Sequence, residues 1–181
     1  MCPGPAAAAV RPWPYTHAMD TTSVTVRAAT PEDLRFVLGL VPRLTEFGAP
    51  PWRPAEAIEA DSAASLAEAL ESAGEEGAVL VAEDRDGERL GVVHVEVEAD
   101  YITGEERAFV GDLIVTREAE GKGVARALMA AAEAWARARG LGSLTLYVFA
   151  GDRRARDFYA RLGFLEDGLR LMLPLEEREA S

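Results

Sequence analysis

Glu120-Gly121-Lys122-Gly123-Val124-Ala125 joins two segments with regular apolar patterns. It follows a mostly apolar run over 108–115 and opens a segment, 121–139, whose apolar residues recur at helical spacing. Free backbone N–H groups at the start of a helix favour an anion, and glycines let a phosphate approach the backbone closely. The stretch therefore predicts a buried strand, a phosphate-binding turn and a long amphipathic helix.

Two other phosphate-binding loops do not match this stretch. A Walker loop ends in Gly-Lys-Ser/Thr, whereas here Gly123 follows Lys122, which disfavours a nucleotide-phosphate hydrolase. A dinucleotide-binding fingerprint has a third glycine where this chain has Arg126. A Gly-x-Gly before a helix also occurs in ordinary tight turns, so the interpretation depends on further residues.

The rest of the chain alternates strand and helix patterns, which predicts an α/β domain with a mixed sheet. Period-two or short apolar runs predict strands over 23–28, 78–83, 90–98, 108–115, 144–148, 164–165 and 169–173. Capping residues and helical spacing predict helices over 30–40, 55–72, 121–139 and 152–162. We expect an N-terminal extension over 1–20, one domain over 21–175 and a tail over 176–181, with Met19 as an alternative start.

A second motif follows thirty residues after the first. It reads Asp152-x-x-Ala155-x-x-Phe158-Tyr159-x-x-x-Gly163-Phe164, in which Asp152 caps a short helix. Together the two motifs resemble those of the GNAT acyltransferase superfamily: Q/R-x-x-G-x-G/A at the start of a helix, then N-x-x-A-x-x-F/L-Y-x-x-x-G-F. The resemblance covers residues 79–173 and implies a mixed, mostly antiparallel central sheet, flanked by helices, whose central strands splay apart to admit acetyl-CoA.

The resemblance also implies which residues bind the donor. The pantetheine arm is expected against the backbone of the central strand, whose N–H groups polarise the thioester, and Tyr159 is expected to protonate the departing thiolate. Two positions depart from the family pattern, because Glu120 stands for Gln/Arg and Asp152 for Asn. Lys122, Arg126 and Arg117 are expected to offset the charge of Glu120. The cofactor-binding residues predicted in this way are Leu113, Ile114, Val115, Glu120, Gly121, Lys122, Gly123, Val124, Ala125, Arg126 and Asp152.

The general base is less clear from the sequence. The acceptor amine must lose a proton, and family members often use a Glu where this chain has Gly111. Asp112 and Glu96 are predicted to be catalytic alongside Tyr159, each as a candidate for the base, and His94 and Glu98 are further candidates. The alternative for each is a solvated strand residue. Aromatic residues of the loop at 47–52, Phe47 and Trp52, fall where the family lines its acceptor site.

Composition bears on the partners. The net charge is −12, and the excess of acidic residues lies in 56–106. This segment has sixteen Asp and Glu residues, and its only basic residues are Arg85 and Arg89. Such a surface disfavours nucleic acid and attracts a cationic amine. No apolar run is long enough to span a bilayer, and Cys2 is the only cysteine, so we expect a cytoplasmic protein without a disulfide. Cys2 and His17 carry no expected role.

These observations predict an N-acetyltransferase that moves an acetyl group from acetyl-CoA to a primary amine of a small cationic molecule. Direct attack in a ternary complex is expected, without a metal, and a homodimer is possible from the family. Two alternatives stay open: an acyl-CoA-binding regulatory or degenerate member, and an enzyme that acetylates a protein or peptide amine.

Overall fold

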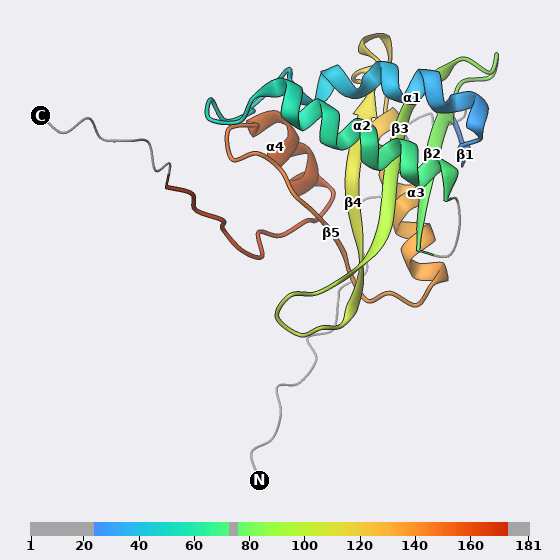
Figure 1. Ribbon diagram of the computed structural model, residues 1–181. Coiled ribbons are helices and arrows are strands. Elements are labelled where there is room, and N and C mark those ends of the chain that lie inside the picture. The colour runs from blue at the N-terminus through green and yellow to red at the C-terminus, as the bar shows by residue number, and fades with distance from the viewer. Residues whose placement is uncertain (1–23, 73–75, 174–181) are drawn as a thin grey trace, which may run out of the picture.

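A computed structural model of the protein describes residues 24–72 and 76–173, and it contains one five-stranded sheet with helices on both faces (Figure 1). The strands lie in sequence order, the first four antiparallel to their neighbours and the last parallel to the fourth. The sheet is therefore mixed and mostly antiparallel, as the sequence predicted. The strands are β1 (Thr25–Ala28), β2 (Gly77–Glu83), β3 (Arg89–Ala99), β4 (Glu106–Val115) and β5 (Leu144–Leu146).

The helices form a layer on each face of the sheet (Figure 1). α1 (Leu34–Leu40) and α2 (Ala55–Glu71) cover one face, α3 (Val124–Ala138) covers the other, and α4 (Arg153–Arg161) follows β5. Short 3-10 helices precede α1 (η1, Pro31–Asp33), follow it (η2, Val41–Thr45) and follow β4 (η3, Arg117–Ala119). Two hydrophobic cores result, one on each side of the sheet.

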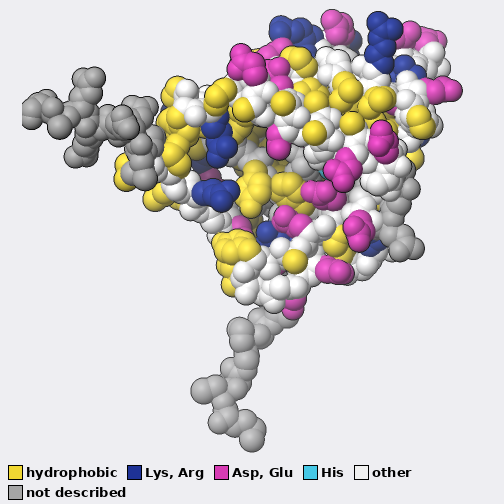
Figure 2. Space-filling view, in the orientation of Figure 1, with side chains coloured by type: hydrophobic (Ala, Val, Ile, Leu, Met, Phe, Trp, Pro, Cys, Tyr) yellow, Lys and Arg dark blue, Asp and Glu magenta, His cyan; other side chains and the backbone are white. Residues whose placement is uncertain are grey.

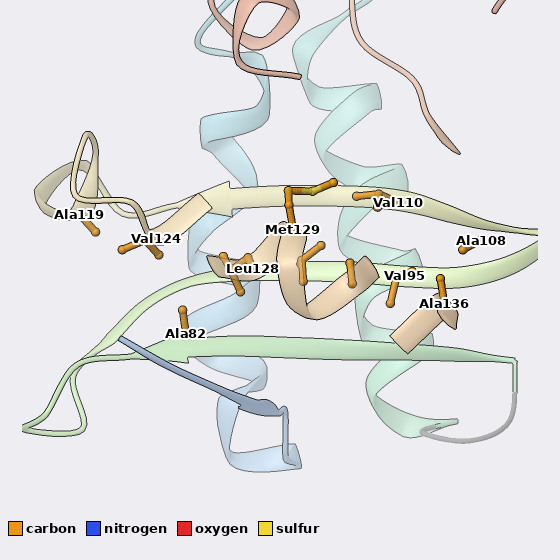
Figure 3. Close-up of a cluster of buried hydrophobic side chains, with 11 residues drawn as sticks. Ala82, Val95, Ala108, Val110, Ala119, Val124, Leu128, Met129 and Ala136 are labelled. Carbon is orange, nitrogen blue, oxygen red and sulfur yellow. The ribbon is translucent and has the colours of Figure 1, made fainter. Parts of the chain in front are cut away.

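The hydrophobic core between α3 and the sheet fixes the position of this helix. Val124, Leu128 and Met129 recur at helical spacing and point onto the sheet, where they meet Val95 and Val110 (Figure 3). Burying a side chain the size of Leu128 contributes about 2 kcal/mol to stability. This packing fixes the first turn of α3 beside the end of β4, which is where the predicted phosphate loop lies.

The structure corrects two predicted element boundaries and does not contain two of the predicted strands. α3 begins at Val124 rather than Gly121, because Gly121 and Gly123 have φ angles of 72° and 82°, which a right-handed helix does not contain. β5 ends at Leu146 and is half-buried, so the predicted buried strand to 148 is too long. Residues 164–165 and 169–173 form no strand, and the leucines among them are exposed because no described segment pairs with the outer edge of β5.

Some predictions concern residues that the structure does not describe. The extension at 1–20, with Cys2, His17 and the alternative start at Met19, lies outside the described residues, as does the tail at 176–181. The domain boundaries therefore stay predictions. Within 24–72 and 76–173, no helix is both long and apolar enough to cross a membrane.

A buried carboxylate connects the first helix to the sheet. Asp33 is fully buried, accepts from Arg27 at 2.7 and 3.1 Å and from the Thr30 backbone N–H at 2.8 Å, and lies 2.6 Å from Arg89 Nε. The hydrogen bonds from Arg27, the largest cause, hold the pKa of Asp33 well below its usual range despite burial. This cluster fixes the start of α1 against β1 and β3.

Replacing this carboxylate is expected to destabilise the protein in a pH-dependent way. A lowered native pKa means that the carboxylate contributes its stability above the unfolded pKa of about 4 and loses it as the pH falls further. We expect Asp33→Asn to lower the free energy of unfolding by about 3 kcal/mol at pH 7, and by less at pH 3. Chemical denaturation at both pH values measures this, with exposed Glu32→Gln as control. A loss that is equal at both pH values would contradict the assignment.

Candidate active site

β4 contains a one-residue bulge at Gly111. His94 pairs with Asp112 and the next residue of β3, Val95, pairs with Val110, so Gly111 has no partner on β3. The bulge changes which neighbour the backbone faces. Before it, the Ala108 N–H donates toward β5, to Ser143 O at 3.0 Å. After it, the Thr116 N–H donates toward β3, to Leu90 O at 2.8 Å. Because backbone directions alternate along a strand, the extra residue is what reverses the pattern.

The reversal leaves backbone groups of β4 without a strand partner. The Thr116 backbone N–H points toward β3, and so does that of Ile114, two residues earlier. The backbone N–H groups of Leu113 and Val115 therefore point toward the side of β5. β5, however, pairs with β4 only from Ala108 to Val110. The two strands thus part beyond Val110, which confirms the predicted splay. Of the three predicted backbone contacts, Leu113 and Val115 face the resulting gap and Ile114 does not.

The predicted phosphate loop lies at the end of β4 and presents bare backbone donors. No described residue accepts a hydrogen bond from the N–H groups of Gly121, Gly123, Val124, Ala125 or Arg126. The first helical bond of α3 runs from Ala127 N–H to Gly123 O at 3.0 Å. The positive φ of both glycines turns the chain so that these donors cluster at the positive end of the helix dipole. Within residues 121–126, only the Lys122 N–H has an acceptor in the described chain, Ala119 O at 3.3 Å.

Glu120 is neutralised by two arginines that the sequence did not single out. Its carboxylate accepts hydrogen bonds from Arg43 in η2 and from Arg154 in α4, the latter at 2.6 Å. These contacts, led by the one from Arg154, lower the pKa of Glu120. The expectation that Lys122, Arg126 and Arg117 offset this charge is wrong. Lys122 and Arg126 are exposed without an ion-pair partner in the described chain, and Arg117 binds Glu46 at 2.5 Å.

α4 places Asp152 and Tyr159 as the second motif predicted. Asp152 caps the helix by accepting from the Ala155 N–H at 2.8 Å. Tyr159 lies between the rings of Phe158 and Phe164, with centroids at 5.2 and 5.6 Å. Burial, with a smaller contribution from Asp152, raises the pKa of Tyr159 to about 12. The phenol is therefore fully protonated at neutral pH, and its hydroxyl has no hydrogen-bond partner among the described residues.

Three polar side chains form a row across β3 and β4. His94 Nδ1 lies 3.9 Å from Asp112 Oδ2, and His94 Nε2 lies 3.8 Å from Glu96 Oε2. The alternative of solvated strand residues is wrong for two of them, since His94 is 2% and Asp112 5% exposed. The Glu96 side chain is 43% exposed, so the row leads from a buried carboxylate to the surface. Glu98 is already engaged by Arg107 and the Thr145 hydroxyl.

The bulge also explains why a carboxylate lies beside His94 although position 111, where family members often have Glu, is glycine. A Cβ on Gly111 would lie 3.0 Å from His94 Nδ1, so position 111 faces His94. Asp112 faces His94 too, because the bulge puts both positions on one side of the sheet. Glycine inside a strand is a known sign of a bulge, so this signal was present in the sequence.

The predicted acceptor loop packs against the start of α4. Arg154 lies over the Phe47 ring, 5.4 Å from its centroid, and a Cβ on Gly48 would lie 2.4 Å from the Asp152 backbone N. Trp52 is half-exposed nearby in sequence. Figure 2 shows a hollow on the face that carries α2, with Lys and Arg side chains along one side and Asp and Glu along the other. Within the described residues, no group of three or more His, Cys, Asp or Glu could hold a metal ion.

The turn geometry of the phosphate loop gives a stability prediction. A Cβ at either Gly123 or Gly142 would meet nothing within 4 Å, but only Gly123 has a positive φ. We expect Gly123→Ala to lower the free energy of unfolding by about 1 kcal/mol, and Gly142→Ala to cause no loss. Chemical denaturation of both variants measures the difference, and equal effects would contradict the backbone strain proposed for Gly123.

Comparison with known proteins agrees with this geometry. The model of the acetyltransferase (GNAT) family matches residues 42–164. Aminoglycoside N(6')-acetyltransferase type 1 of Stenotrophomonas maltophilia is 35% identical over 149 residues, which are 78% of this chain and 83% of that protein.

Two solved structures share the fold. AAC(6')-Iy in complex with a bisubstrate analog, CoA-S-monomethyl-acetylneamine, has a TM-score of 0.64 and 22% identity over 84% of this chain and 98% of its own. Aminoglycoside 6'-N-acetyltransferase AAC(6')-IG of Acinetobacter haemolyticus has a TM-score of 0.64 and 17% identity over 85% and 99%. With the family match and the splayed β4–β5 pair in agreement, the chain belongs to the GNAT family of acetyltransferases.

Proposed function

We propose that this acetyltransferase moves an acetyl group from acetyl-CoA to a primary amine of a small cationic molecule, by direct attack in a ternary complex. The observation that carries the proposal is the bulge at Gly111, which frees the Leu113 and Val115 backbone beside the bare amides of α3. The relative that is 35% identical acts, by its name, on the 6'-amine of aminoglycosides. Aminoglycosides carry several ammonium groups and are therefore the first acceptors to test.

The backbone donors fit the donor substrate. A diphosphate at this loop satisfies N–H groups that have no partner in the described chain, those of Gly121 and 123–126. The exposed Lys122 and Arg126 side chains add positive charge. The gap beside Leu113 and Val115 admits an extended pantetheine arm, whose amides need strand-like partners. A backbone N–H aimed at the thioester oxygen stabilises the charge that develops there during attack.

The row of Asp112, His94 and Glu96 fits the acceptor side. An ammonium group must lose a proton before its nitrogen can attack. Asp112 directly precedes Leu113, whose backbone lines the proposed thioester position, and it is the proposed proton acceptor. His94 and Glu96 extend from it toward solvent, and the gaps of 3.9 and 3.8 Å are of a size that a water molecule or a small rotation closes. Glu96 also attracts a second ammonium group.

The reaction balances with these residues and solvent water. The ammonium group first gives one proton to Asp112, which passes it to solvent. The neutral nitrogen then bonds to the acetyl carbon, the carbon–sulfur bond breaks, and the sulfur takes the proton of Tyr159. The second proton of the nitrogen leaves as the amide forms, and Tyr159 regains a proton from solvent, so one proton is released per turnover. Because burial raises the pKa of Tyr159 to about 12, the phenol carries this proton at neutral pH.

A panel of amines tests the proposed function. Thiol release from acetyl-CoA is measured with aminoglycosides, a polyamine and a lysine-containing peptide at equal concentration, beside calorimetric titration of acetyl-CoA alone. We expect release to be fastest with aminoglycosides. Release with the peptide alone would favour a peptide or protein acetyltransferase, and tight acetyl-CoA binding without release from any amine would favour a regulatory protein.

Removing the Tyr159 hydroxyl is expected to slow catalysis without weakening donor binding. Tyr159→Phe keeps the ring between Phe158 and Phe164. We expect kcat to fall about 10²-fold, the usual size of a lost general acid, while the dissociation constant of acetyl-CoA changes less than twofold. Tyr101→Phe, at an exposed position in the β3–β4 connection, is the control. An unchanged kcat would overturn the general-acid assignment.

The two carboxylates of the row are separated by matched amide variants. We expect Asp112→Asn to lower kcat about 10²-fold or more, because the proton acceptor is lost. Glu96→Gln is expected to raise KM for a polycationic acceptor with a smaller effect on kcat, because its carboxylate is exposed and attracts charge. The reverse pattern, with kcat lost in Glu96→Gln alone, would move the base to Glu96.

A further inference from the structure

We propose that Arg43 and Arg154 bind the phosphates of the donor, and that Glu120 holds these two arginines in place until the donor displaces it. The inference rests on the proposed function, since it concerns the donor of the same reaction. It assigns a role to three residues whose arrangement follows neither from the motif nor from the fold. Glu120 acts as a resident anion that competes with the phosphates.

The contacts around Glu120 show how closely it holds the arginines. Arg43 comes from η2 and Arg154 from α4, and each donates an Nη2 to a different carboxylate oxygen of Glu120. Arg43 is only 14% exposed, and its Nη1 is buried without a hydrogen-bond partner in the described chain. A buried guanidinium nitrogen without a partner is costly, and a phosphate oxygen would satisfy it. Arg43 is thus prepared for an anion larger than one carboxylate.

The arginines lie next to the proposed phosphate site. Glu120 directly precedes Gly121, whose N–H is the first of the bare donors. A guanidinium bonded to Glu120 is therefore near the place where a diphosphate would bind the loop. Guanidinium groups bind carboxylates and phosphates with the same planar pairs of hydrogen bonds, so exchange of one anion for the other keeps the donor geometry.

The local charge balance makes the competition significant. Five cationic side chains gather at this end of the sheet, and only two of them, Lys122 and Arg126, have no anionic partner in the described chain. Arg117 is held by Glu46, which also lies 3.6 Å from Arg43. Removing the charge of Glu120 therefore leaves Arg154 without its anionic partner and Arg43 with only the longer contact to Glu46, while the bare backbone donors stay unchanged.

Arg154 also links the donor and acceptor sides. Its guanidinium lies over the Phe47 ring while it binds Glu120. A donor phosphate that draws Arg154 away from Glu120 acts on the same side chain that contacts the acceptor loop. Donor binding that moves Arg154 would therefore also change its contact with Phe47, in the loop that we expect to hold the amine.

The test measures CoA affinity in charge-neutral variants. We expect Glu120→Gln to lower the dissociation constant of CoA about fivefold at low salt, because a like charge near the phosphates is removed. Glu118→Gln, an exposed residue of the same short helix, removes the same charge without touching either arginine and is the control. Its dissociation constant is expected to change less than twofold. Calorimetric titration gives all the values, and thermal unfolding confirms that the variants are folded.

A double-mutant comparison shows whether the arginine carries the effect. We expect Arg154→Gln to raise the dissociation constant of CoA about fivefold, and the gain from Glu120→Gln to shrink when Arg154 is already replaced. If Glu120→Gln leaves CoA affinity unchanged or weakens it in a folded protein, the inference is overturned while the proposed function stands. If the unaltered protein does not bind CoA at all, the proposed function fails first.

Discussion

The site depends on one backbone irregularity, the bulge at Gly111 in β4. An unbroken strand would direct the N–H groups of Leu113 and Val115 toward β3, where the antiparallel pairing would use them. The extra residue reverses this direction while the hydrogen bond from Thr116 keeps the end of β4 against β3. β5 stops pairing at the level of Val110, so the freed donors face a gap. One inserted residue thus produces both the open side of β4 and the donors that line it.

The same bulge explains why a glycine in place of the acidic residue expected from the family does not remove the carboxylate. On a regular strand, a carboxylate moved by one residue would point to the opposite face of the sheet. At a bulge, two successive residues share a face, and both Gly111 and Asp112 are directed at His94. The absence of a side chain at position 111 leaves room for the buried imidazole of His94. The carboxylate can therefore be at position 112 instead of 111 only together with a glycine at 111 and the bulge.

The sequence predicted the local features well and the long-range ones poorly. Capping residues gave the start of α4 at Asp152, and apolar spacing gave the buried face of α3, because each of these depends on neighbours in the chain. The partners of Glu120 were missed, since Arg43 is 77 residues away and nothing local marks it. The alternation at 169–173 predicted a strand, but a strand also needs an edge to pair with, and no residue of the segment reveals whether one is available.

Glu120, which stands where the family motif has Gln or Arg, is also compensated by neighbouring residues. A lone carboxylate beside a phosphate site would oppose the donor, but two guanidinium groups cancel its charge and hold it in a defined position. Removing that carboxylate makes both arginines more available to the diphosphate, whereas removing either arginine leaves Glu120 with one guanidinium partner in place of two. The effects of changing Arg43, Glu120 and Arg154 on donor affinity therefore depend on one another. Each effect follows from the charge that the change leaves without a partner.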